Sequence, residues 1–140
     1  MAKGILICTG LALLLAVAAV PQTPAGPKHH VVFQLSEPVG DEWALLWAHV
    51  TNLRTAFAND GGSQVEVVFF GEGINMLRRA GDYASVLKEL ADSGVVIAAC
   101  QNAMRSRQLT TEDLVPFATQ VDAGVAELAR KQEAGWAYIH

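Results

Sequence analysis

The sequence predicts an α/β protein built on a five-stranded parallel sheet with helices on both faces. Three observations favour this class. Short apolar segments alternate along the chain with segments whose apolar residues recur at helical spacing, which is typical of a parallel sheet with helical crossovers. The apolar segments are nearly continuous, as expected for strands that are buried on both faces. The chain has 140 residues, a length that suits one domain.

The first strand and the first helix are predicted from one apolar run and one helical stripe. The run is VVFQL, residues 31–35, and the turn-forming residues up to Gly40 end it. Asp41 is the expected N-cap of the helix that follows. The apolar face of this helix consists of Trp43, Leu46, Trp47, Val50, Leu53 and Phe57. The sequence NDGG at 59–62 ends the helix.

The middle of the chain repeats the strand–helix pattern. We expect the second strand at VEVVFF, residues 65–70, and the third at VVIAA, residues 95–99. After the second strand the glycines of GEG, residues 71–73, turn the chain, and a short helix begins over 74–79. A further helix ends at Gly94, and its apolar stripe consists of Tyr83, Val86, Leu87 and Leu90.

The last part of the chain contains shorter elements. The polar segment after Cys100, as far as residue 108, is predicted to be helical. We expect a short fourth strand over 119–121 and a helix over 123–133. The closing sequence WAYIH, residues 136–140, is the expected fifth strand.

The N-terminal segment has a different composition from the rest. Residues 4–20 carry no charge, Lys3 precedes them, and a proline-rich stretch follows. This pattern is typical of a secretory signal peptide. The sequence therefore divides into a signal peptide or membrane anchor at 1–25, a linker at 26–30 and a domain at 31–140. We expect export, to the periplasm, with a membrane anchor formed by residues 4–20 as the alternative.

Composition argues against several classes of function. The chain has 10 Lys and Arg against 14 Asp and Glu and no basic run, so nucleic acid is not an expected partner. It has no Cys-x-x-Cys motif, which disfavours a dithiol oxidoreductase. Adjacent histidines in an extended segment point in opposite directions, so His29 and His30 do not predict a metal site.

Cys100 is the main candidate for a functional residue. Removal of residues 1–25 would leave it as the one cysteine of the mature chain. Its predicted place is the carboxyl end of the third strand, where parallel sheets hold their sites. The backbone at Gln101 and Asn102, where a helix begins, would stabilise a thiolate, the reactive form in sulfur exchange. The alternative is a small buried apolar residue.

Other residues are candidates for the surroundings of Cys100. Arg105 and Arg107 follow in the same helical segment, and either would add positive potential. Glu37, Gly71 and Gly73 come after the first and second strands and are possible rim residues, with a solvated loop charge and a tight turn as the alternatives. The glycines do not predict nucleotide binding, since the dinucleotide fingerprint lacks its third glycine.

Four stretches carry a resemblance to a known family: VVFQLSE, VEVVFFGEGINML, GVVIAACQNAMRSRQL and GWAYIH. Over Val31 to His140 the chain resembles the DsrE/DsrF-like family of small sulfur-relay proteins. The resemblance implies a flavodoxin-like, three-layer fold with five parallel strands and assembly into trimers or hexamers. It also implies a cysteine that carries sulfur as a persulfide, and only Cys100 matches that position. Asn102 and Met104 match the motif around it without an assigned role.

The resulting hypothesis is that the protein is a sulfur carrier that resembles a sulfurtransferase. Cys100 would accept sulfane sulfur from a persulfide or polysulfide and pass it to the thiol of a partner, with no metal or organic cofactor. One alternative is a non-catalytic oligomeric protein that binds a small anionic or nucleotide-like ligand. Another is an assembly protein that uses the rims as an interface. Reactivity of the thiol separates the first hypothesis from the other two.

Overall fold

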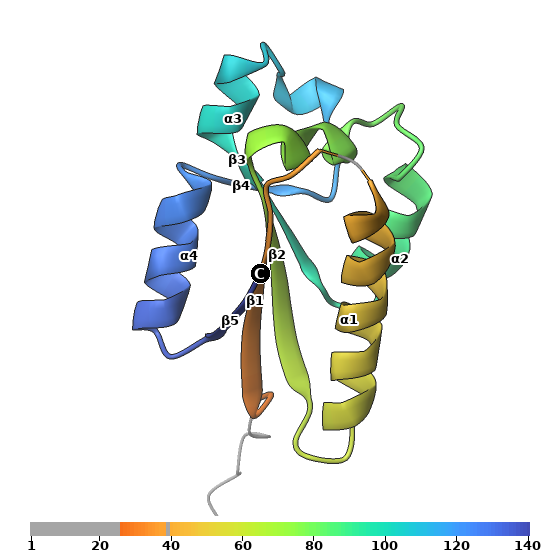
Figure 1. The fold of residues 1–140 in the computed structure, drawn as a ribbon, viewed down its shortest axis with the longest axis vertical. Helices are drawn as coiled ribbons and strands as arrows, with labels where there is room; N and C mark the ends of the chain where they lie inside the picture. Colours follow the sequence, from red (N-terminus) through yellow and green to blue (C-terminus); the bar gives the residue numbers. More distant parts are fainter. Residues whose placement is uncertain (1–25, 39) are drawn as a thin grey trace, which may run out of the picture.

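The computed structural model describes residues 26–38 and 40–140, which form a central sheet with helices on either side (Figure 1). All five strands are parallel, in the order β4-β3-β2-β1-β5, which confirms the predicted fold class. The strands are β1 (His29–Leu35), β2 (Ser63–Phe69), β3 (Val96–Cys100), β4 (Thr119–Val121) and β5 (Ala137–Ile139). The α-helices are α1 (Asp41–Phe57), α2 (Ala84–Asp92), α3 (Gln101–Ser106) and α4 (Gly124–Glu133). Two short 3-10 helices are η1 (Gly71–Leu77) and η2 (Thr111–Asp113).

The two faces of the sheet are packed unequally. In Figure 1, α1 and α2 lie on one side of the sheet, α4 lies on the other, and α3 lies beyond the carboxyl ends of the strands. The face under α1 and α2 carries the larger apolar cluster, which includes the fully buried Val67, Phe69 and Leu87. The cluster under α4 is small: Val32, Val68, Ala98 and Leu128. Because a buried large apolar side chain stabilises by about 1.5–3 kcal/mol, most of the hydrophobic stabilisation comes from the first face.

The register of the strands aligns their carboxyl ends at one edge of the sheet. Leu35 pairs with Phe69, and Phe69 pairs with Ala99. Cys100 is the last residue of β3 and pairs with Val121, the last residue of β4. The segments that follow these strands therefore begin side by side.

Some strand boundaries differ from those expected. The third strand was predicted over 95–99, but β3 extends to Cys100 because this residue pairs with Val121 of β4. The first and second strands begin earlier, at His29 and Ser63, which pair with each other. The predicted fourth strand has the bounds expected, and the fifth is shorter than WAYIH.

Two predictions at helix starts were wrong in detail. Gly40, not Asp41, occupies the N-cap position of α1, and Asp41 is its first helical residue. The segment that begins at Gly71 is the 3-10 helix η1 rather than a turn before a helix. Gly73 lets η1 lie directly over the end of β1, since a Cβ at this position would be 2.3 Å from the carbonyl oxygen of Leu35. Sequence periodicity does not report such a close backbone approach.

The segment 1–25, expected to be a signal peptide or membrane anchor, lies outside the described residues. Within the described part of the chain, no helix combines the length and the apolar character that crossing a membrane requires.

Candidate functional site

Two backbone N–H groups point at the sulfur of Cys100. The N–H of Ala103, in the first turn of α3, donates to Sγ at 3.4 Å. The N–H of Gly124, the first residue of α4, donates to Sγ at 3.2 Å. Hydrogen bonds from N–H groups at helix starts favour an anionic sulfur over a neutral one. The environment of Cys100 is therefore suited to a thiolate.

Strand pairing explains why two helix starts meet at one sulfur atom. The chain passes from β3 directly into α3, so the first turn of α3 lies next to Cys100. Because Val121 of β4 pairs with Cys100, the chain that leaves β4 passes the same point. Helix α4 begins three residues later, at Gly124.

An ion pair holds the segment between β4 and α4. The carboxylate of Asp122 accepts two hydrogen bonds from the guanidinium of Arg130, each at 2.8 Å. This hydrogen bonding by Arg130, with a further hydrogen bond from the N–H of Ala123, holds the pKa of Asp122 well below its usual range. Asp122 is thus a carboxylate at physiological pH, tied to the helix that carries Gly124.

The sulfur lies at the floor of a cavity of about 270 Å³. Cys100 is only 4% exposed, whereas Val125 at the rim is 65% exposed. The apolar side chains of the lining are Phe70, Ala103, Ala123 and Val125. Reagents must therefore enter the cavity to reach the thiol.

Polar side chains line another part of this cavity. They are Asn102, Ser106 and Arg107. Arg107 forms an ion pair with Glu72 of η1, and its side chain is 23% exposed. The cavity therefore combines an apolar wall with one guanidinium group whose charge Glu72 partly offsets.

The structure brings some of the sequence-predicted residues together and separates others. Asn102, Arg107 and Gly71 line the cavity above Cys100. Gln101 and Arg105 line a different hollow, where Gln101 donates to Gln120 at 3.1 Å. Arg105 donates to the side-chain oxygen of Asn102, and Gly73 is buried within η1 against the end of β1.

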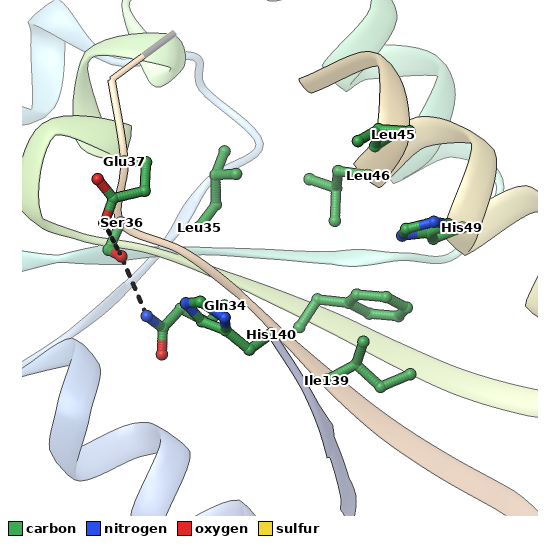
Figure 2. A pocket seen from close by; sticks show the side chains of 10 residues that line it. Gln34, Leu35, Ser36, Glu37, Leu45, Leu46, His49, Ile139 and His140 are labelled. Atoms are coloured by element: carbon green, nitrogen blue, oxygen red, sulfur yellow. Dashed lines mark hydrogen bonds between the residues drawn. The ribbon is translucent and has the colours of Figure 1, made fainter. Parts of the chain in front are cut away.

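Glu37 lies at the same edge of the sheet but in a separate cavity of about 230 Å³. Figure 2 shows Leu45, Leu46 and His49 of α1 on one side of this cavity and the residues that follow β1 on the other. Ser36 accepts a hydrogen bond from Gln34 at 3.0 Å and donates one to Glu37 at 3.3 Å. This cavity shares no lining residue with that of Cys100.

The sequence did not identify Gly124 or Phe70 as parts of the site. Gly124 reaches Cys100 because β4 pairs with β3, and Phe70 packs against Gly124. The available signal was the glycine at the start of the predicted helix, directly after the predicted fourth strand. That signal becomes informative only when the order of the strands is known.

The histidines do not form a metal site in the described residues. His29 stacks on Phe57 and contacts Asp60 at 3.1 Å, and His30 packs against Trp136. Over residues 26–38 and 40–140, no three or more His, Cys, Asp and Glu side chains are grouped so that they could hold a metal ion.

Comparisons with known proteins give one family and support the fold. The sequence model of the DsrE/DsrF-like family matches residues 31–140. The protein of unknown function MTH1491 from Methanobacterium thermoautotrophicum is 35% identical and superposes with a TM-score of 0.74, over 80% of this chain and 98% of that one. The ychN protein from E. coli is 13% identical with a TM-score of 0.63, over 81% and 97% of the two chains, and so supports the fold alone. None of the curated proteins matches the chain.

Replacement of Gly124 by alanine tests the role of its N–H. The new Cβ would lie 2.8 Å from the Cβ of Phe70, so Phe70 and the start of α4 must move apart, and we expect the N–H of Gly124 to lose its present position at Sγ. We expect Gly124→Ala to slow the alkylation of Cys100 by iodoacetamide by about 2- to 10-fold, because one hydrogen bond contributes roughly 0.5–1.5 kcal/mol. An unchanged rate in Gly124→Ala would contradict this role.

Proposed function

Because the chain belongs to the DsrE/DsrF-like family, which is generally linked to sulfur relay, we propose that it carries sulfane sulfur as a persulfide on Cys100. The observation that carries this proposal is the pair of N–H groups, from Ala103 and Gly124, that donate to Sγ at the floor of a cavity. Sulfur exchange proceeds through the thiolate, and two N–H donors would stabilise that form.

Loading is a nucleophilic substitution at sulfur. The thiolate of Cys100 attacks the terminal sulfur of a persulfide or polysulfide, and a new S–S bond forms. The donor's own S–S bond breaks, and its electron pair leaves with the donor as a thiolate or a shortened polysulfide. No external oxidant or reductant takes part, since one S–S bond replaces another.

Delivery reverses the roles. The thiolate of a partner attacks the outer sulfur of the Cys100 persulfide and takes it as a new persulfide. The S–S bond to Cys100 breaks, and Sγ leaves with the electron pair as a thiolate. The N–H groups of Ala103 and Gly124 stabilise this leaving group, which lowers the barrier to release.

The cavity restricts which donors reach the sulfur. With Cys100 4% exposed, a broad protein surface cannot contact Sγ, whereas a small polysulfide or a narrow protruding segment can. Loading adds an outer sulfur about 2 Å beyond Sγ. A partner can therefore reach the transferable sulfur without reaching Sγ itself.

Assembly and export stay predictions. Trimers or hexamers are expected from the family resemblance, and the exposed apolar side chains of Leu45, Val125 and Tyr138 support such contacts. Light scattering that gives the mass of a monomer would contradict assembly.

Export is tested by cell fractionation followed by N-terminal sequencing. A full-length chain found in the cytosol would contradict export.

Intact-mass measurement after exposure to inorganic polysulfide tests the carrier role. We expect the Cys8→Ser protein, which retains Cys100, to gain mass in whole units of sulfur that a thiol reductant removes. The Cys100→Ser protein should lose the adduct at this position and keep its fold, because serine is close in size but far less acidic. Cys100 that stays inert until the protein unfolds would favour the non-catalytic binding protein instead.

Arg105 and Arg107 lie in the same segment and together test whether a positive charge in the cavity attracts an anionic sulfur donor. Arg107 lines the cavity of Cys100, and Arg105 lines a different hollow. We expect Arg107→Met to slow loading by an anionic polysulfide by about 2- to 5-fold, the range of a partly exposed charge contact. Arg105→Met should have little effect, and added salt should narrow the difference. Equal rates in the two variants would contradict a role for Arg107.

A further inference from the structure

Glu66 is a buried charged residue that the sulfur chemistry does not use. It lies in β2 on the face covered by α4 and is 3% exposed. Placing a carboxylate in such a position costs free energy unless it is paired. Burial raises the pKa of Glu66, and its contact with Lys131 only partly offsets that effect.

A group of side chains on and after α4 surrounds this carboxylate. Glu66 Oε2 lies 2.6 Å from Lys131 Nζ, while Oε1 has no hydrogen-bond partner. Lys131 Nζ also lies 3.6 Å from Glu127 Oε1 and 4.1 Å from the centre of the Trp136 ring. From β1, His30 packs against the same Trp136 ring. The ion pair therefore joins the middle of the sheet to the last part of α4.

The sheet-facing residues of α4 make three attachments along one line. Gly124 and Lys131 are seven residues apart, which on an α-helix is about two turns and nearly the same face. Leu128 lies between them and packs on the small cluster of Val32, Val68 and Ala98. Gly124 touches Cys100 at one end, and Lys131 is bound to Glu66 at the other.

The middle attachment alone gives α4 little directional constraint. Apolar contacts attract without fixing an orientation, and the cluster under α4 is small. An ion pair in a buried place is directional, and such pairs are best known for setting register rather than for adding stability. The Glu66–Lys131 ion pair lies where it can fix the position of α4 on the sheet.

We propose that the Glu66–Lys131 ion pair positions α4 on the sheet and thereby holds the N–H of Gly124 at Cys100 Sγ. Glu66 touches no reacting atom and acts through the helix as a positioning residue. The functional meaning of this inference rests on the proposed sulfur-carrier role. The claim that the ion pair positions α4 predicts a change in the reactivity of the Cys100 thiol, which can be measured without sulfur transfer.

The test replaces the pair by apolar residues of similar size in the full chain. Glu66→Leu together with Lys131→Met should leave the thermal unfolding midpoint close to that of the wild type, since apolar replacement of a buried pair is often neutral or stabilising. We expect the alkylation of Cys100 by iodoacetamide to slow by about 2- to 10-fold, because the Gly124 N–H is no longer held in place. Lys131→Arg, which keeps the charge, should stay near the wild-type rate.

A matched control comes from α2. Lys88 and Asp92 form an exposed ion pair at 2.6 Å that has no link to α4. Lys88→Met should leave the alkylation rate unchanged. A folded Glu66→Leu/Lys131→Met protein that alkylates at the wild-type rate would overturn the proposal.

The pH dependence of the alkylation rate in Glu66→Gln separates a positioning role of Glu66 from general structural support. This measurement tests the proposal even if the double variant does not fold. Glutamine resembles the protonated form of Glu66. At neutral pH the wild type, with its charged pair, should alkylate faster than Glu66→Gln. As the pH falls through the raised pKa of Glu66, the two rates should converge, because both side chains are then neutral.

Each outcome has a distinct meaning. A rate ratio of one at all pH values, or a ratio that does not change with pH, would overturn the positioning role. If the ratio changes as expected and polysulfide still leaves no adduct on Cys100, the positioning role stands and the sulfur-carrier function fails.

Discussion

All five strands run in one direction, and this constraint decides where chemistry is possible in the protein. Parallel strands need crossovers, so each carboxyl end at the common edge is followed by a new segment that starts there. Because β3 and β4 are neighbours, the starts of α3 and α4 are neighbours as well. Their N–H groups converge on the sulfur that ends β3, where they would stabilise a thiolate formed during a reaction.

One face of the sheet contributes mainly to stability, and the other contributes to the reactivity of Cys100. The face under α1 and α2 contains the larger apolar cluster, which provides most of the hydrophobic stabilisation. The face under α4 has few apolar contacts and a buried ion pair, yet its helix supplies one of the two donors to Cys100. A helix with few apolar contacts can change position without loss of the fold, so reactivity there depends on what holds the helix in place.

The sequence predicted those features that depend on local pattern. The alternation of apolar runs and helical stripes predicted the parallel sheet, and even the three residues of β4 were identified. Arg105 and Arg107 could not be told apart, because residues two positions apart on a helix point to different sides and only tertiary packing shows which side faces the cavity. Gly124 was missed because its contact with Cys100 depends on the pairing of distant strands. Glu66, the one charge within VEVVFF, was also missed, because its partner on α4 is 65 residues further along the chain.

The central claim is that Cys100 holds a sulfur atom that another nucleophile can remove. Cyanide attacks the outer sulfur of a persulfide, forms thiocyanate and releases the thiolate. The direct measurement is the yield of thiocyanate from Cys8→Ser protein that has been loaded with polysulfide and freed of excess reagent. The account predicts about one thiocyanate for each sulfur atom that the intact mass shows on Cys100, and none when Cys100→Ser is added. Thiocyanate that is absent from the loaded protein, or equal with and without Cys100, would contradict it.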